Sequence, residues 1–195
     1  MSLLLESWAG GPKFSLGLAY GYLRNVSAVG DWTRSLMHNR IMPTHRIICS
    51  FAVQQHLATI DKLQTRGIPL ANRCSLCQNG LESHDHLFFN CDYSAAVWDR
   101  LLQWIGYPNL GYNLITILEN SGATGKHCRW EHAWFQVTVA AAVYQLWGEH
   151  NARIFSNRHS SIDACVHQVK YLVCVWMFMW KTHKSYMCIV DRLST

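Results

Sequence analysis

Proline, glycine and charged residues are scarce in this chain. It has 195 residues, of which four are proline, twelve are glycine and 15% are charged, whereas 50% are hydrophobic. Disordered chains have the opposite bias, with few apolar residues and much proline or charge, so the composition predicts a packed protein. The length is sufficient to bury a sizeable core. We therefore expect one continuous helical body.

Long hydrophobic runs are also missing. The longest uninterrupted one, residues 171–180, is shorter than the roughly 20 residues that a membrane-spanning helix needs. Residues 1–5 are apolar but lack the basic region and the small-residue cleavage site of an export signal. We expect an intracellular protein, nuclear or cytoplasmic, with no membrane partner and no small-molecule substrate. In such a protein, clustered cysteines bind metal more often than they form disulfides.

Acidic residues number 12, and no two of them are adjacent. Reverse transcriptases hold two metal ions with an Asp-Asp pair, because two-metal phosphoryl transfer requires both ions, and this chain has no such pair. It has no Walker-type phosphate loop, and its eleven histidines are dispersed without a neighbouring nucleophile. The sequence therefore predicts a protein that is not an enzyme and has no catalytic residues, neither a polymerase nor a nuclease centre.

Cysteine and histidine are concentrated in one stretch, RCSLCQNGLESHDHLFFNC. Zinc prefers four thiolate or imidazole ligands in a tetrahedron, and the tight Cys-x2-Cys turn of Cys74 and Cys77 directs two sulfur atoms at one ion. His86 and Cys91 complete the pattern Cys-x2-Cys-x8-His-x4-Cys, although His84 would also complete a four-ligand site. The pattern predicts one Zn²⁺, and its role should be structural because four ligands leave no open position.

Apolar residues recur at helical spacing in several segments. Helices are predicted over residues 44–57, 59–66, 93–105, 130–155 and from about 161 onward. The apolar stripe of the first comprises Ile47, Ile48, Phe51, Ala52 and Gln55. Thr44 and Thr59 are the expected N-caps, and Gly67 and Gly106 the expected left-handed stops. The tryptophans of the later helices should pack in the core, although the run LVCVW would also suit a strand.

The predicted fold class is mostly α, a small helical domain with an inserted zinc-binding module whose ligands follow the order Cys-Cys-His-Cys. We expect an N-terminal segment (1–13), helices together with the zinc-binding domain (14–106, with the zinc module at 74–91), a linker (107–129) and a C-terminal helical region (130–195). The linker is the least periodic part of the chain. Glu82, within the zinc module, is expected to be a structural carboxylate at a helix start, or an acceptor for a ligand N–H, rather than a catalytic base.

The stretch CSLCQNGLESHDHLFFNCDYSAAVW resembles a known family. That family reads Cys-Pro-Leu-Cys, then Glu, then His-Leu-Phe-Phe-x-Cys and then Trp, and here Ser75 replaces the proline. It is the reverse-transcriptase zinc-binding domain family, found C-terminal to the reverse transcriptase of plant LINE-type (non-LTR) retrotransposons. The resemblance implies that His86, rather than His84, is the ligand. It also implies an accessory domain that is separated here from its polymerase.

Two further stretches are similar to the family, which extends the resemblance to residues 14–155. ATIDKLQTRGI matches through Leu57, Thr59, Asp61, Leu63, Gly67 and Ile68. YQLWGEHNARIF matches through Tyr144, Trp147, Glu149, Asn151, Arg153 and Phe155. The chain departs from the family at Thr44 and His45 (usually Pro-Lys), at Phe51 (usually Trp), and at His56 and His150 (usually Arg). These departures keep the ligand set and reduce the positive charge.

Charge is unevenly distributed along the chain. Residues 1–73 hold eight Lys/Arg against three Asp/Glu, residues 74–124 one against five, and residues 125–195 eight against four. Phosphate backbones bind cations, so any contact with RNA or DNA should use the basic flanks and not the acidic module. The expected contacts are Arg46, Lys62, Arg66 and Arg73, with Arg153 and Arg158 among the basic residues that follow the module. The alternative is a zinc-stabilised structural or protein-interaction module without a nucleic-acid role, whose partner is a reverse transcriptase or another protein.

Overall fold

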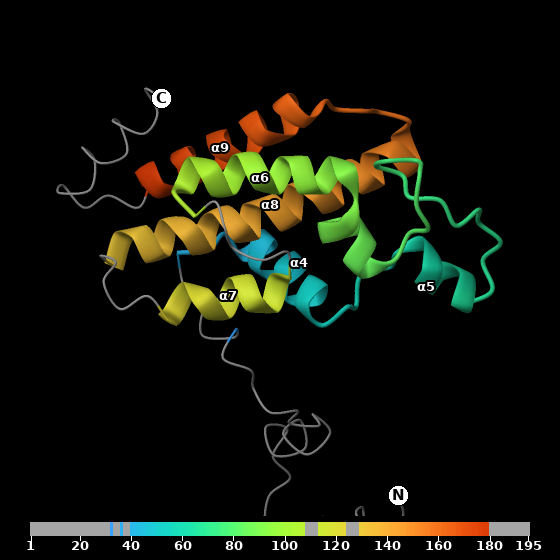
Figure 1. Cartoon of the computed structure of the whole chain (residues 1–195), viewed down its shortest axis with the longest axis horizontal. Helices are drawn as coiled ribbons and strands as arrows, with labels where there is room; N and C mark the ends of the chain where they lie inside the picture. The colour runs from blue at the N-terminus through green and yellow to red at the C-terminus, as the bar shows by residue number, and fades with distance from the viewer. Residues whose placement is uncertain (1–31, 33–35, 37–39, 108–112, 124–128, 180–195) are drawn as a thin grey trace, which may run out of the picture. The chain divides into compact units, whose positions relative to one another are not determined.

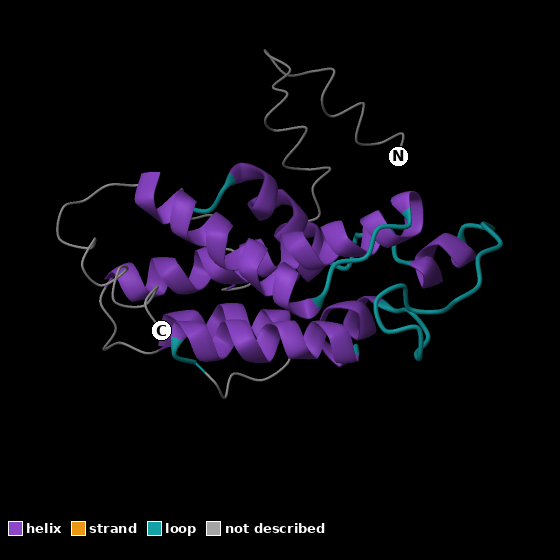
Figure 2. Cartoon of the chain, turned by 90° about the horizontal axis from the view of Figure 1, so that it is seen from above, coloured by secondary structure: helices purple, strands orange, loops and turns teal. Residues whose placement is uncertain are grey.

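The structure is a computed structural model that describes residues 32, 36, 40–107, 113–123 and 129–179. Every regular element within these ranges is a helix, and none of their residues forms a strand (Figure 2). The described residues belong to one compact unit, Asp31–Thr195. These findings confirm the expected fold class, mostly α with an inserted Cys/His module. The predicted segment 1–13 lies outside the described residues.

The long helix α8, Arg129–Ser156, is central to the fold. Figure 1 shows α6 and α9 along one side of it, and α4 and α7 along the other. The side chains of residues 133–143 are all buried. A helix that is buried on every side needs neighbours all around it, and three consecutive alanines at residues 140–142 allow them to approach closely. Helical spacing of apolar residues predicts a single buried side, which is too narrow for α8.

Helices α6, Asp92–Ile105, and α9, Ile162–Met179, pack against each other and against α8. The first lies where a helix was predicted over residues 93–105, and it buries Val97, Trp98, Leu101, Leu102 and Ile105, which stand at helical spacing. It ends at Gly106, whose φ of +86° suits glycine because a side chain would be strained there. The run LVCVW lies in α9 and is helical, so the strand alternative is wrong. Trp98 and Trp134 are buried, as expected of core tryptophans.

Helix α9 alone among the described helices is long and apolar enough to cross a membrane. Core helices pass the same test of length and composition. One side of α9 does pack in the core, through Val166, Val169 and Val173. The absence of a membrane partner stays a prediction.

Helix α4, Pro43–Val53, begins one residue before the expected N-cap Thr44. Proline suits the first helical position, because its φ is already helical and the N–H that it lacks would have no partner inside the helix. The helix buries His45, Cys49 and Ala52, whereas Ile47 and Phe51 of the predicted stripe are 51% and 44% exposed. Because both sides of α4 carry apolar residues, the spacing of these residues predicted the wrong buried face.

Helix α5, Ile60–Thr65, follows the predicted N-cap Thr59 and precedes Gly67, whose φ is +83°. Helix α7, Leu114–Ala123, lies in the segment predicted as a linker and was not expected. Its buried residues Ile117 and Leu118 belong to the core, and α7 packs against α8. The predicted boundaries at residues 106 and 129 stay predictions.

Candidate metal centre

Four side chains converge at one point of the molecule: Cys74, Cys77, His86 and Cys91. Their ligand atoms all lie within 4.8 Å of one another. The Sγ atoms of Cys74 and Cys91 are 3.8 Å apart, and the Cys77 Sγ is 3.3 Å from Nε2 of His86. A tetrahedral ion with Zn–S bonds of about 2.3 Å separates two sulfur atoms by about 3.8 Å. The cluster therefore has the donor set and the dimensions to hold such an ion.

The first two cysteines lie on a tight turn. The N–H of Cys74 donates to the carbonyl oxygen of Gly80 (2.8 Å), and the N–H of Gln78 donates to that of Cys74 (2.9 Å). Gln78 has a φ of +63°, which reverses the chain at this point. The backbone N–H groups of Leu76 and Cys77 donate to the Cys74 sulfur. These donors stabilise a thiolate, the form in which cysteine binds metal.

The other two ligands lie at the ends of a single π-helical turn, η1, His86–Asn90. His86 is its first residue, and Cys91 follows its last. The N–H of Cys91 donates to the carbonyl oxygen of His86 (2.8 Å), a bond between residues five apart. This turn places His86 and Cys91 on the same side of the chain. Cys91 is also the N-cap of α6. The cluster is thus attached directly to a core helix.

The imidazole of His86 is closely enclosed. A Cβ atom at Gly80 would lie 2.5 Å from Cε1 of His86, so the glycine leaves room for the ring. His84 does not join the cluster: its ring packs against Phe88 with centroids 4.9 Å apart, and its buried Nε2 has no hydrogen-bond partner among the described residues. The geometry therefore agrees with the family resemblance in favouring His86 over His84.

Protonation in the cluster is shared between Cys74 and Cys91. The pKa of Cys91 is lowered to about 5, first because the Cys74 thiol donates a hydrogen bond to its sulfur. Burial opposes this effect, and the N–H groups of Ser94 and Tyr93 add to it. The pKa of Cys74 is raised by the same hydrogen bond and by burial. A metal ion would replace the shared proton. Three thiolates and an imidazole suit zinc, and four protein ligands leave no position for a reacting water.

Glu82 is fully buried behind the cysteine turn. Its Oε1 accepts a hydrogen bond from the N–H of Ile60 (2.9 Å), and its Oε2 accepts one from the N–H of Ser75 (3.3 Å). Because Ile60 begins α5 and Ser75 lies between the two cysteines, this carboxylate ties a helix start to the metal turn. The expectation of a carboxylate at a helix start holds, but the helix is α5 and not the segment that follows Glu82.

His150 of α8 also binds Glu82. Its Nε2 lies 2.8 Å from Oε1 of Glu82, and both side chains are buried. An ionised carboxylate only accepts hydrogen bonds, so an ionised Glu82 requires the proton on Nε2 of His150. The ring stacks on Trp147 with centroids 4.7 Å apart. His150 is one of the two histidines that replace arginine of the family pattern, and it lies in the interior rather than on a nucleic-acid-binding surface.

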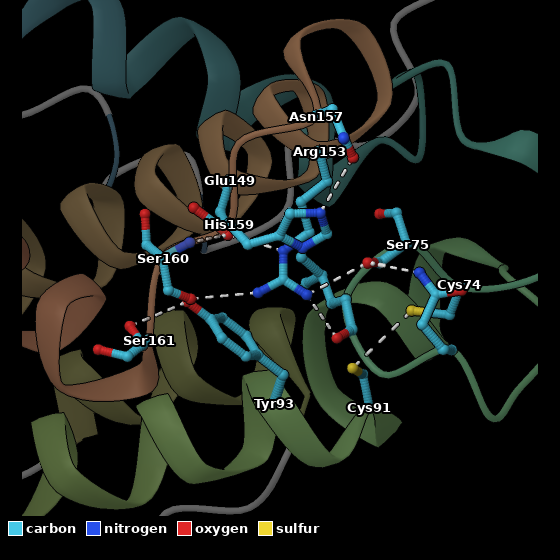
Figure 3. Close-up of polar contacts among 12 residues, drawn as sticks. Cys74, Ser75, Cys91, Tyr93, Glu149, Arg153, Asn157, His159, Ser160 and Ser161 are labelled. Carbon is cyan, nitrogen blue, oxygen red and sulfur yellow. Dashed lines mark hydrogen bonds and ion pairs between the residues drawn. The ribbon is translucent and has the colours of Figure 1, made fainter.

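Arg153 connects α8 to the cysteine turn (Figure 3). Its Nη1 donates to the carbonyl oxygens of Leu76 (2.6 Å) and Ser75 (3.2 Å), and its Nε donates to Oε1 of Glu149 (2.7 Å). Burial would raise the pKa of Glu149, but hydrogen bonds from Ser160 and Arg153 outweigh it and lower that pKa. Arg153 therefore has a structural role, contrary to its inclusion among the basic residues available to a nucleic acid.

Tyr93 of α6 also contacts Arg153. The guanidinium of Arg153 lies over the Tyr93 ring at 4.6 Å from its centroid. The Tyr93 hydroxyl donates to the carbonyl oxygens of Ser160 (3.2 Å) and Ser161 (3.3 Å), just before α9. The loop that precedes α9, the end of α8 and the start of α6 thus meet around one guanidinium, as Figure 3 shows.

The four residues predicted to bind nucleic acid do not form one cluster of contacts. Arg46 lies on α4 and Lys62 on α5, and both are half-buried, whereas Arg66 and Arg73 are exposed. None of the four forms an ion pair with a described residue. They remain available to a phosphate, and their role stays a prediction.

Sequence reasoning missed the partners of Glu82 and the role of Arg153. Glu149 and Arg153 stand four residues apart, a spacing that indicates a helical ion pair, but no spacing indicates a contact with Ser75. The family pattern contains both residues without assigning them a partner. The residues that hold the cysteine turn from behind could therefore be found only in the folded chain.

Residues 14–98 match the protein family described as zinc-binding in reverse transcriptase. The matched segment contains all four residues of the cluster and ends at Trp98, so α8 and its contacts with the cysteine turn lie beyond it. No curated protein and no solved structure gives a significant match to the chain.

Proposed function

Because residues 14–98 belong to the family of zinc-binding domains in reverse transcriptases, we propose that Cys74, Cys77, His86 and Cys91 bind one Zn²⁺ ion. The observation that carries this proposal is the convergence of their four ligand atoms within 4.8 Å. Gly80 supports it, since a side chain there would displace the His86 ring. All four predicted ligands would thus bind the same ion, and His86 would coordinate it through Nε2.

The ion is structural in this proposal. It links the cysteine turn to η1 and to the start of α6. Binding energy in such sites is largely folding energy. The buried carboxylate of the module, Glu82, is occupied by three hydrogen bonds and is unsuited to act as a base. We assign no catalytic role to the metal.

An accessory nucleic-acid role is proposed for the basic flanks. The chain would be a retrotransposon-derived domain of plant LINE type that binds RNA or DNA in the nucleus or cytoplasm. Arg46, Lys62, Arg66 and Arg73 support this, because none of them has an ion-pair partner among the described residues. Three thiolates around Zn²⁺ give the site one net negative charge, so the acidic module itself would repel phosphate.

A second candidate function is a zinc-stabilised structural or protein-interaction module, with a reverse transcriptase or another protein as partner. The exposed apolar residues Ile47 and Phe51 on α4 favour it. Nucleic-acid binding is the discriminating property, because a purely protein-binding module needs no affinity for phosphate.

Metal analysis tests the zinc site. The purified chain should contain one zinc per molecule, and cobalt substitution should give the absorption of a tetrahedral thiolate site. His86→Ala should lose the metal, whereas His84→Ala should retain it. If His84→Ala loses the metal and His86→Ala retains it, the ligand assignment is wrong.

Salt-dependent binding tests the nucleic-acid role. The affinity for a labelled oligonucleotide should fall with salt, by about 0.9 in the log–log slope for each phosphate contact on duplex DNA. Replacing Arg46, Lys62, Arg66 and Arg73 by alanine should flatten that slope. Absence of salt-sensitive binding to RNA or DNA by the zinc-loaded protein would instead favour the protein-interaction module.

A further inference from the structure

An open groove of about 640 Å³ lies on α8, on residues that do not contact the metal cluster. Its walls include Ile48 of α4, Tyr144 and Asn151 of α8, and the segment from Arg158 to Ser160. We call it the α8 groove. Asn157, with a φ of +48°, ends α8, and the N–H of Arg158 donates back to the carbonyl oxygen of Ala152 (3.1 Å). This turn folds the chain back on α8, and the residues that follow it, 158–160, line the groove.

The residues of the family-like segment YQLWGEHNARIF lie at two different places in the structure. Glu149 and Arg153 hold the cysteine turn and the loop before α9, so the fold accounts for them. Tyr144 and Asn151 line the groove instead, and the side chain of Asn151 forms no hydrogen bond with a described residue. Phe155 is 77% exposed. The zinc module therefore explains only part of this segment, and the rest faces solvent or the groove.

Two aromatic rings in the groove are held in fixed orientations. Tyr144 packs against His45 of α4 with ring centroids 4.4 Å apart, and Trp147 stacks on the buried His150 at 4.7 Å. Each ring uses a histidine as support, and both also line the groove. Rings that are oriented before binding lose little conformational entropy when a planar ligand stacks on them.

The groove wall carries polar side chains that can donate hydrogen bonds to a ligand. The side chains of Gln145, Asn151 and Arg158 form no hydrogen bond with a described residue. The only carboxylate in the wall, Glu149, is paired with Arg153 and also accepts the N–H of Ser160 (2.8 Å). The groove thus offers two amides, one uncompensated guanidinium and two aromatic rings.

We propose that the α8 groove binds a short stretch of single-stranded nucleic acid. Unpaired bases stack on aromatic side chains, amide groups pair with base edges, and guanidinium groups bind phosphate. A duplex would keep its base faces away from Tyr144 and Trp147. A peptide ligand is less suitable, because the groove wall has more unpaired polar side chains than aliphatic ones. This assignment rests on the nucleic-acid role proposed above and adds the preferred substrate, a single strand, and its place.

Gly148 provides a selective test. It lines the groove, and a Cβ atom there would meet only Oε1 of Gln145, at 3.7 Å. Larger side chains at this helical position can therefore enter the groove without disturbing the core. Gly148→Leu should weaken binding of a labelled single-stranded oligonucleotide about tenfold, the loss expected for one stacked base. Gly148→Ala is the matched control and should bind normally, with a melting temperature at or above that of the wild type.

Arg158→Ala and Asn151→Ala give independent readouts. The first should reduce the salt dependence by about 0.7 in the log–log slope, the value for one phosphate contact on a single strand. The second should alter the relative affinity for homopolymers of different bases. Anisotropy titrations with single-stranded and duplex oligonucleotides measure both effects. The zinc content and melting temperature of every variant should confirm that it is folded.

The outcomes separate this proposal from the one on which it rests. If the four-alanine flank variant loses binding while Gly148→Leu binds like the wild type, nucleic acid binds at the flanks and the groove assignment is wrong. Equal affinity for single strand and duplex would also contradict the groove. If the zinc-loaded wild type binds no oligonucleotide, the accessory nucleic-acid role and the groove both fail.

Discussion

The zinc module is held from two sides that differ in chemistry. Its ligand side consists of Cys74, Cys77, His86 and Cys91, whose donor atoms lie within 4.8 Å of one another. Its α8 side consists of Glu82, with its hydrogen bonds to α5 and His150, and of Arg153, which donates to two carbonyl oxygens of the cysteine turn. In our proposal a metal ion joins the ligands of the first side. The second needs residues of α8 that follow the module by more than fifty positions.

This difference shows that the family match marks only part of the structural unit. The matched residues 14–98 contain the whole ligand side. The α8 side takes His150 and Arg153 from a helix that is itself buried among α4, α6, α7 and α9. A fragment that ended at residue 98 would keep the ligands but would expose Glu82 and the back of the cysteine turn. We expect such a fragment to bind zinc more weakly than the whole chain.

Loss of the metal should have the largest effect. Structural zinc sites contribute about 10–16 kcal/mol of apparent binding energy in small domains, so chelation or Cys91→Ser should unfold at least the module and the start of α6. Circular dichroism and the melting temperature, measured with and without a chelator, follow this change. Full helical signal and unchanged thermal stability after complete metal removal would show that the α8 side suffices.

Arg153→Ala should be the most destabilising change on the α8 side. It removes the donor to two carbonyl oxygens of the cysteine turn and to that of Ser160, and it leaves Glu149, which is 7% exposed, without its cation. Breaking a buried ion pair costs roughly 3–5 kcal/mol. Urea denaturation of the zinc-loaded protein measures this loss, and Arg153→Lys should recover only part of it because lysine lacks the planar fork. A loss below about 1 kcal/mol would mean that the metal alone holds the cysteine turn.

Glu82→Gln should destabilise the chain by roughly 1–3 kcal/mol, the cost of leaving buried donors without an acceptor. The amide has one oxygen for the N–H groups of Ile60 and Ser75 and for His150, where the carboxylate has two. The same denaturation experiment measures the change. A double variant with Arg153→Ala should show whether the two contacts are coupled, since both act on the cysteine turn.

Gly80→Ala should act on the ligand side alone. The new Cβ would lie 2.5 Å from Cε1 of His86, so the ring must move away from its position in the cluster. We expect zinc affinity to fall about tenfold, which corresponds to about 1.4 kcal/mol. Competition with a chromophoric chelator measures the affinity. Gly67→Ala is the control: its φ of +83° makes the change strained, but no atom lies within 4 Å, so zinc affinity should not change.

Arg100→Ala should have the smallest effect. Arg100 pairs with Asp163 between α6 and α9, but the two side chains are 46% and 85% exposed. Exposed ion pairs contribute no more than about 1 kcal/mol. Compared with Arg153→Ala in the same buffer, this variant shows whether burial, rather than the ion pair itself, makes the α8 side strong. A loss equal to that of Arg153→Ala would contradict this explanation.

Local patterns predicted the elements that depend on neighbours in the chain. The stripe of α6 and its stop at Gly106, the α5 helix after Thr59, and the long helix α8 all follow from spacing and capping residues. The start of α4 at Pro43 and the helix α7 were missed. In α7 the apolar run is short, and its helix is stabilised by packing on α8 rather than by its own periodicity.

The sequence by itself determined the cluster of potential zinc ligands, because their spacing of two, eight and four intervening residues is a local property that one tight turn and one π-helical turn can close. It also determined a mostly helical chain, since apolar periodicity is local as well. Only the tertiary structure decided which face of α4 is buried, where Glu82 finds its partners, and that Arg153 binds the cysteine turn rather than solvent. Those contacts join residues up to 78 positions apart, and a pairing over that distance depends on how the helices pack, which the local pattern of residues does not encode.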